Sequence, residues 1–204
     1  MRIYGLFFVM YFHGSLAAQN NWTLQKEKDG IKISNRPSPA SSFNDVRVEV
    51  DLPGNIDQLA AILLDVNKYT EWAYATRKSE LIKQLGPGKL IYYSEIEVPW
   101  PATDRYFYAL FELIKDPGGG SMQVISSSIL YEAPVPKDLV KVPYSKGSWS
   151  VTQSSKKSIH VDYILELNPG GSLPAWILNL FSSKGPLETF ENIRLKMKLL
   201  NPAN

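Results

Sequence analysis

Long stretches of this chain alternate between apolar and polar residues with a period of two, the pattern of half-buried strands. The clearest is 46–52, where four apolar residues share one side and Arg47, Glu49 and Asp51 share the other. The same alternation predicts strands at 22–27, 31–35, 81–85, 90–98, 105–113, 122–130, 147–152 and 159–167. Because most connections are short turns, such as the Asp-Gly turn within 28–30, these strands are expected to pair antiparallel.

Two parts of the chain change to a helical period. Asn55 is a suitable N-cap for an apolar helix at 56–64, and a second short helical segment is expected at 66–72. The chain ends in an amphipathic stretch, 173–200, whose pattern is interrupted at Gly185-Pro186, a candidate hinge or kink. One long helix or two consecutive helices would therefore need an apolar partner. Together these elements predict an α+β fold with a curved antiparallel sheet of about eight to nine strands wrapped around a long C-terminal helix, with a short helical pair after the third strand.

The first eighteen residues have the pattern of a secretory signal peptide. Arg2 precedes an apolar run at 3–12, and 14–18 offers small residues at the cleavage positions. The run is shorter than the ~20 apolar residues that a membrane span needs. We therefore expect residues 1–18 to be a cleaved signal peptide, 19–204 to form one domain, and the protein to be secreted or periplasmic. The alternative is an uncleaved anchor or an apolar N-terminus.

The amino-acid composition excludes several kinds of functional site and partner. The 204 residues are 44% hydrophobic and 21% charged, with a net charge of +2 and no block of like charges. This balance is typical of a globular domain and argues against a nucleic-acid partner, which needs clustered Lys and Arg. The absence of cysteine excludes thiol nucleophiles and zinc–thiolate sites. No hydrolase or metalloprotease motif occurs, His160 shares its strand face with acidic residues, and no cofactor is expected.

Several short motifs together match a known family. They are Asp65-Val66 with Tyr69 and Trp72, Val98-Pro99-Trp100-Pro101 with Asp104-Arg105, Gly147-Ser148-Trp149, Leu173-Pro174-Ala175-Trp176-Ile177, and Gly185-Pro186 through Asn192-Ile193-Arg194. From about residue 22 to 201 the chain resembles the START lipid-transfer domains, the steroidogenic-acute-regulatory-protein-related members of the helix-grip superfamily. Tyr106 is a departure, because many relatives carry an acidic residue after the Asp-Arg pair, and it leaves ligand specificity open.

The resemblance implies a tunnel between the concave sheet face and the C-terminal helix that holds one lipid-like molecule. Strand and helix periodicity then supplies candidate wall residues: Leu90, Tyr92, Ser94, Ile96, Phe107, Ala109, Phe111, Tyr163, Leu165, Ile177, Leu180 and Phe181. Ser94 and Ala109 would leave room among larger neighbours. Arg105 shares the face of Phe107 and is expected inside, either as an anchor for a polar ligand group or in a structural ion pair with Asp104 or Glu80. For each wall residue the alternative is ordinary core packing.

The primary hypothesis is a non-enzymatic, monomeric protein that binds a lipid or other hydrophobic molecule for transfer or sensing, with transient membrane contact. The alternative is a cyclase-like or hydrolase-like enzyme that acts on a hydrophobic substrate in the same cavity, with Glu80 or a tyrosine as the acid or base. A third possibility is an interaction domain whose cavity is filled by side chains. A cavity volume below about 300 Å³ would be small for a ligand pocket.

Overall fold

The computed structural model describes residues 22–39, 41–134 and 136–200. The predicted signal peptide, 1–18, lies outside this part of the chain. The elements, in chain order, are β1 (Thr23–Lys28), β2 (Ile31–Arg36), β3 (Asp45–Pro53), α1 (Ile56–Leu64), the 3₁₀-helix η1 (Val66–Glu71), β4 (Thr76–Gly86), β5 (Lys89–Ile96), β6 (Arg105–Lys115), β7 (Ser121–Ile129), β8 (Val140–Lys141), β9 (Tyr144–Ser155), β10 (Ser158–Asn168), α2 (Ala175–Asn179), the π-helical turn η2 (Leu180–Lys184) and α3 (Gly185–Leu200).

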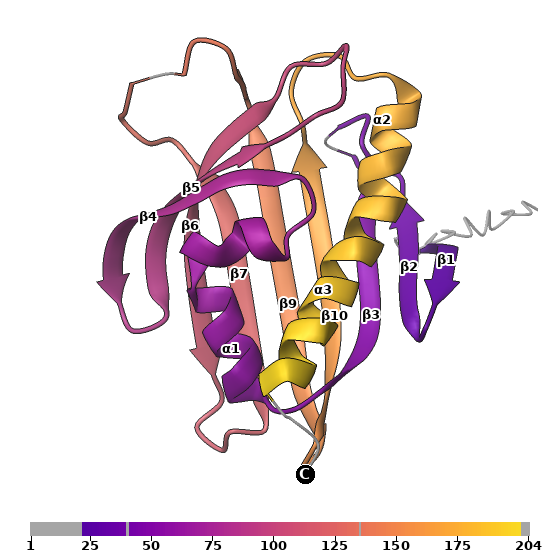
Figure 1. Cartoon of the computed structure of the whole chain (residues 1–204), viewed down its shortest axis with the longest axis vertical. Coiled ribbons are helices and arrows are strands. Elements are labelled where there is room, and N and C mark those ends of the chain that lie inside the picture. The colour runs from indigo at the N-terminus through magenta and orange to yellow at the C-terminus, as the bar shows by residue number, and fades with distance from the viewer. Residues whose placement is uncertain (1–21, 40, 135, 201–204) are drawn as a thin grey trace, which may run out of the picture.

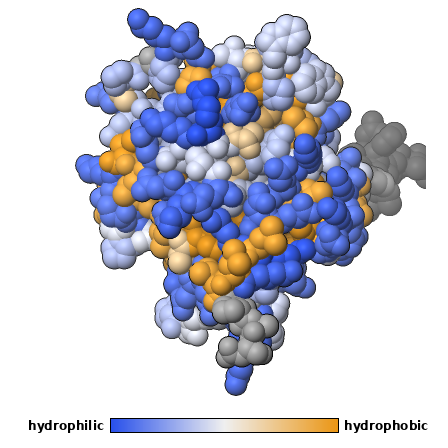
Figure 2. Space-filling view, in the orientation of Figure 1, coloured by the Kyte–Doolittle hydropathy of each residue, from blue (hydrophilic) through white to orange (hydrophobic). Residues whose placement is uncertain are grey.

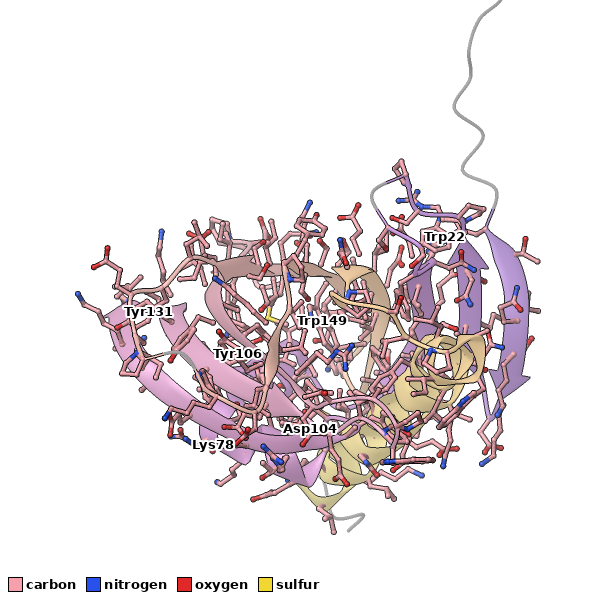
Figure 3. All side chains as sticks on the ribbon, turned by 90° about the horizontal axis from the view of Figure 1, so that it is seen from above. Trp22, Lys78, Asp104, Tyr106, Tyr131 and Trp149 are labelled. Atoms are coloured by element: carbon pink, nitrogen blue, oxygen red, sulfur yellow. The ribbon has the colours of Figure 1, made fainter. Side chains whose placement is uncertain are left out.

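The strands form one sheet in the order β1-β2-β3-β10-β9-β7-β6-β5-β4, with β8 paired parallel to β6 off this path. After β3 the chain crosses through α1 and η1 to β4 at the opposite edge, and the later strands then lead back to β10 beside β3. The sheet curves around the C-terminal helix, which runs across its concave face (Figure 1). Seen from above, the strands enclose the helix on three sides, and Trp149 lies inside the curve (Figure 3).

The predicted fold class is confirmed. The alternation on β3 places Val46, Val48, Val50 and Leu52 on the inner side, and each is at most 2% exposed. The sheet differs from the prediction by one element, because the described residues contain ten strands. The additional strand is β8, whose two residues are too few to show a period in the sequence.

The helical pair after β3 begins where the sequence predicts. The Asn55 side chain accepts a hydrogen bond from the backbone N–H of Gln58, and the Gln58 side chain accepts one from the Asn55 N–H, both at 3.0 Å. This capping box satisfies two donors that the first turn of a helix leaves unpaired. It fixes the direction of α1, whose Ile56, Leu59 and Leu63 are buried in the core.

The C-terminal segment is one continuous helical stretch whose regular hydrogen bonding is interrupted directly before Gly185-Pro186, where the sequence predicts a break. The turn η2 is π-helical, and the Gly185 N–H donates to the Leu180 carbonyl. Because a proline has no N–H and its ring clashes with the carbonyl four residues earlier, the turn before Pro186 is wider than an α-helical one. Beyond it, the buried stripe of α3 consists of Leu187, Phe190, Ile193 and Met197.

The outer surface of α3 carries apolar side chains near its end. Leu195, Leu199 and Leu200 are 58%, 80% and 52% exposed. Figure 2 shows hydrophobic residues gathered over this end of α3 and the neighbouring α1. Within the described ranges, no helix has the length and hydrophobicity needed to cross a membrane. The same ranges contain no cluster of three or more His, Cys, Asp or Glu side chains suited to a metal ion.

Replacing Asn55 with alanine should lower the free energy of unfolding by about 1 kcal/mol, because the capping box is lost while the core stays intact. Urea denaturation of the two proteins measures the difference. Asn44→Ala is the matched control, since Asn44 is an exposed loop residue, and surface changes of this kind usually stay within ~0.5 kcal/mol. Equal losses in the two variants would contradict the capping role.

Candidate functional site

A cavity of about 260 Å³ lies between the concave face of the sheet and the C-terminal helical segment. We call it the central cavity. Its volume is below the ~300 Å³ that marks the lower end for a ligand pocket, so volume alone does not exclude an interaction domain. The sheet side of the cavity is lined from strands β4, β5, β6, β7, β9 and β10, and its helical side from α2, η2 and α3. The aromatic and aliphatic wall residues include Phe43, Leu63, Tyr69, Trp72, Tyr74, Tyr92, Val98, Phe107, Phe111, Val142, Trp149, Tyr163, Leu165, Leu167, Leu173, Leu178, Phe181 and Phe190. The wall is therefore mainly apolar, as small-molecule pockets are.

Small residues on neighbouring strands create the space. Ala109 on β6 lies opposite Ser128 on β7, and Ser126 on β7 lies opposite Gly147 on β9. Ser145, two residues before Gly147 on β9, also lines the cavity. Large side chains at these positions would fill the distance between sheet and helix, whereas this band of small ones leaves it open.

Ten of the predicted site residues line the central cavity: Tyr92, Ser94, Ile96, Arg105, Phe107, Ala109, Phe111, Tyr163, Leu165 and Phe181. Whether they contact a ligand stays a prediction. The other four are not among the residues that line the cavity. Leu90 and Ile177 are buried. Leu180 is only partly buried, outside the wall, and Glu80 is half-exposed and paired with Lys78 at 3.1 Å.

Arg105 is buried, with only 4% of its surface exposed, and it lies at the end of the cavity formed by loops. Its three nitrogens donate to main-chain carbonyls: Nη1 to Thr103, Nη2 to Gly170 at 3.1 Å, and Nε to Pro169 at 3.4 Å. Burial lowers the pKa of the guanidinium from its ordinary value. Arg105 thus ties the start of β6 to the 169–170 turn.

The predicted ion pair of Arg105 with Asp104 or Glu80 is wrong. The Asp104 carboxylate instead accepts hydrogen bonds from Arg77 Nη1 at 2.6 Å and from the Val98 N–H at 2.8 Å. Among the described residues no carboxylate lies within 4 Å of the Arg105 guanidinium. The carbonyls of Thr103, Pro169 and Gly170 take the place of a counter-ion, and main-chain partners of this kind leave no mark in the sequence.

Buried tyrosines give the cavity a polar component without charge. The Tyr92 hydroxyl lies 2.9 Å from the Ser126 hydroxyl. Burial raises the pKa of Tyr92 to about 12, and it raises the pKa of Tyr163 and Tyr69 well above their usual range. All three phenols are therefore neutral hydrogen-bonding groups at physiological pH. Tyr69 is already engaged, because its hydroxyl donates to the Leu63 carbonyl at 2.6 Å.

On the helical side, the start of α3 is held close to the segment after η1. A Cβ atom on Gly185 would lie 2.8 Å from the Tyr74 ring, so only glycine allows this approach. The Tyr74 N–H donates to the Thr189 hydroxyl at 3.0 Å, and its ring packs edge-on against Phe181 at 5.6 Å. Tyr74 therefore joins η2 and α3 to the wall opposite the sheet.

A cavity enclosed between a curved antiparallel sheet and its C-terminal helix is the arrangement that the motif resemblance implies, and a family comparison agrees with it. The model of the START domain matches residues 12–201. The chain belongs to the START domain family. Its sheet, its C-terminal helix and the cavity between them are thus those of a START domain.

Individual relatives are more distant. An uncharacterized protein of Pseudomonas aeruginosa is 29% identical over 178 residues, which are 87% of each chain. The phosphatidylcholine transfer protein of Rattus norvegicus is 24% identical over 169 residues, 81% of this chain and 78% of that one. The crystal structure of a STAR-related lipid transfer protein from Xanthomonas axonopodis has a TM-score of 0.78 at 28% identity, covering 87% of this chain and 98% of that chain.

Sequence reasoning missed the contribution of β7 and β9 to this START domain cavity. Ser126, Ser128, Ser145 and Gly147 all line it. The three consecutive serines at 126–128 show no apolar alternation. The signal that could have found them is strand parity, because Met122 and Val124 are buried on the same face as Ser126.

Arg105→Met should lower the free energy of unfolding by about 2–4 kcal/mol, because a buried charged donor that bonds to three main-chain carbonyls is lost. Arg77→Met is the matched control. Arg77 also bridges two carboxylates, Glu95 and Asp104, but its side chain is 46% exposed, so a loss below about 1 kcal/mol is expected. Urea unfolding of both variants provides the comparison, and a smaller loss for Arg105→Met than for Arg77→Met would refute the clamp.

Stability should fall as the pH rises from 10 toward 12, in part because Tyr92 is buried. Above pH 10 the unfolded chain releases the phenolic proton while the folded chain retains it, so deprotonation favours unfolding. Each such tyrosine contributes a slope of up to about 1.4 kcal/mol per pH unit. Urea midpoints between pH 9 and 11.5 should therefore decline less steeply in Tyr92→Phe than in the parent. Parallel curves for the two proteins would show that the pKa of Tyr92 is not raised in the folded chain.

Proposed function

We propose that this protein binds a lipid or another hydrophobic small molecule in the central cavity and exchanges it with membranes outside the cytoplasm. The observation that carries the proposal is the mainly apolar cavity between the sheet and the C-terminal helix. An apolar ligand gains free energy by leaving water for such a site, in proportion to the area it buries. Relatives of this START domain are named as lipid transfer proteins, which supports the same role here.

The chemistry of the wall favours carriage over catalysis. Its one charged side chain among the described residues, Arg105, is engaged with carbonyls. The tyrosines have raised pKa values, which makes them poor bases near neutral pH. Glu80, the residue that the enzymatic alternative would need, lies outside the cavity beside Lys78. No observation favours a cyclase-like or hydrolase-like reaction.

Membrane exchange has a candidate surface beside the loop end of the cavity. The loop 97–104 contributes Val98 to the wall and Trp100, 88% exposed, to the surface. Trp176 on α2 is 51% exposed, and Leu130 after β7 is 89% exposed. In Figure 1 the start of α2 and the loops after β5 and β7 occupy the same end of the molecule. Indole rings favour the boundary between headgroups and acyl chains, so this end would contact the bilayer.

The proposed cycle needs only one moving element. With Trp100 and Trp176 at the membrane, α2 would separate from the sheet at η2, a ligand would enter, and α2 would close over it. A single protein chain carries a single ligand in this scheme. The leader-like pattern of residues 1–18 supports a location outside the cytoplasm.

The double variant Trp100→Ser, Trp176→Ser should slow transfer of a fluorescent lipid analogue between donor and acceptor liposomes by about tenfold or more, because two interfacial side chains worth about 1.5–3 kcal/mol each in burial are lost. Ile114→Ser is the control, since Ile114 is 70% exposed near the far end of β6. It should transfer at the parent rate.

Native mass spectrometry tests binding itself. After incubation with liposomes, the folded protein should carry one lipid-sized adduct. Protein that stays empty under these conditions, with no transfer in the liposome assay, would overturn the proposed function. Equal slowing in Ile114→Ser and the tryptophan variant would remove only the docking surface.

A further inference from the structure

Three hydroxyl-bearing side chains on the concave face of the sheet line the central cavity. They are Tyr92 on β5, Ser126 on β7 and Tyr163 on β10, and we call them the hydroxyl cluster. Tyr92 and Ser126 are joined by a hydrogen bond of 2.9 Å. Ser126 lies directly opposite Gly147 in the β7–β9 register, and the Tyr163 ring lies over Gly147. From β5 to β10 the three residues cross five neighbouring strands, β5-β6-β7-β9-β10, with Tyr92 in register with Ser128 and Tyr163 in register with Val124, two residues to either side of Ser126.

Tyr163 is the unpaired member. Its ring is fixed by Trp149 and Phe190, with centroids at 4.5 and 5.6 Å. Its hydroxyl has no hydrogen-bond partner among the described residues, in contrast to those of Tyr69 and Tyr92. A Cβ atom on Gly147 would lie 3.2 Å from that hydroxyl, so the glycine keeps its surroundings open. Tyr163 is only partly buried and lines the cavity, so its hydroxyl is available to a ligand oxygen there. The fully buried donor without a partner in the same wall is Trp72 Nε1.

The charges in the cavity wall limit which chemical group of a ligand can pair with the Tyr163 hydroxyl. Arg105 is the one charged residue among the described lining residues, and its three nitrogens already donate to carbonyls. No carboxylate lines the cavity to receive a quaternary ammonium. A zwitterionic or anionic headgroup would lose its hydration here and gain no opposite charge. An uncharged hydroxyl or carbonyl loses far less and is satisfied by hydroxyl partners.

The volume limits the size. The central cavity has a volume of about 260 Å³, below the ~300–1,000 Å³ of pockets that hold drug-sized ligands. This is enough for one short chain but too little for two acyl chains that each cross half of a ~30 Å hydrocarbon core.

We propose that the central cavity selects a compact, uncharged amphiphile with one hydroxyl or carbonyl oxygen, which bonds to Tyr163 of the hydroxyl cluster. This assignment rests on the proposed function and makes it more specific. Its geometry differs from an anchor at Arg105, because the polar group of the ligand lies against the middle strands of the sheet and its chain extends along the aromatic wall.

Four probes of equal chain length separate these features: decan-1-ol, decane, decanoate and decylphosphocholine. Titration calorimetry, with native mass spectrometry for stoichiometry, should show one site that prefers decan-1-ol over decane by about three- to tenfold, the equivalent of one neutral hydrogen bond. Decanoate and decylphosphocholine should bind at least about tenfold more weakly than the alcohol. Tyr163→Phe should abolish the preference for alcohol over alkane while decane binds as before.

Two further variants guard against a change in folding. Gly147→Ala places a methyl group against the Tyr163 hydroxyl and should reduce the same preference. Tyr93→Phe is the matched control, because that hydroxyl donates to Glu95 at 2.8 Å and Tyr93 does not line the cavity. It should keep the parent preference.

The outcomes distinguish this inference from the proposed function. Decane and decan-1-ol binding equally well would retain hydrophobic binding and overturn the hydroxyl site. Decanoate or decylphosphocholine binding as tightly as the alcohol would also overturn it and return the polar anchor to Arg105. Failure of all four probes would overturn the inference, and the proposed function falls with it only if the protein also stays empty after incubation with liposomes.

Discussion

Packing of α3 against the concave face of the sheet removes Leu187, Phe190, Ile193 and Met197 from water. At ~1.5–3 kcal/mol for each large apolar side chain, this burial is comparable to the net stability of a typical domain, ~5–15 kcal/mol. A ten-stranded curved sheet has one apolar concave face, and without α3 that face would be exposed. The order of the strands follows from the same constraint, because the crossover through α1 closes the lower end of the layer that α3 covers.

The upper part of the helical segment is bound less firmly. Helix α2 has five residues, far fewer than an isolated helix needs to persist in water. Ile177 is fully buried, but Trp176 faces solvent and Leu178 and Phe181 face the cavity. Side chains that border a cavity lose packing partners on one side. Local opening of α2 about η2 therefore requires much less free energy than release of α3, so the site can open while the fold persists.

The sequence predicts the secondary structure and the inner face of the sheet better than it predicts the contacts of individual side chains. Strand alternation and the Asn55 cap predict the sheet and α1. Burial of one face of a strand requires apolar residues at every second position, and this pattern remains visible even where a single residue departs from it. The same parity places Arg105, Phe107 and Ala109 on the inner face, which the structure confirms. Strand parity cannot reveal what Arg105 binds, since its partners are main-chain carbonyls: that of Thr103, two residues away, and those of Pro169 and Gly170 in a distant turn.

The differences between prediction and structure have related causes. Leu90 has the correct parity but is buried without lining the cavity, and periodicity does not show how far along a strand a cavity extends. The break expected at Gly185-Pro186 takes the form of the π-helical η2 directly before it, because a helix can continue past a proline when the preceding turn widens. The serines of β7 were missed because a polar residue on an inner face gives the pattern of a loop or an outer face.

In the proposed site, the hydroxyl cluster would decide selectivity for a physical reason. A chain that moves from a bilayer into the central cavity exchanges one apolar environment for another, so the hydrophobic contribution nearly cancels between the two. What remains is the difference in free energy of the ligand's polar group between two environments. At the membrane surface it is hydrated, and in the cavity it is paired with Tyr163. A charged headgroup gains too little there to leave water, whereas a single hydroxyl exchanges one hydrogen bond for another. A weak, neutral polar contact in an apolar cavity therefore allows both capture and release, which a strong ion pair would prevent.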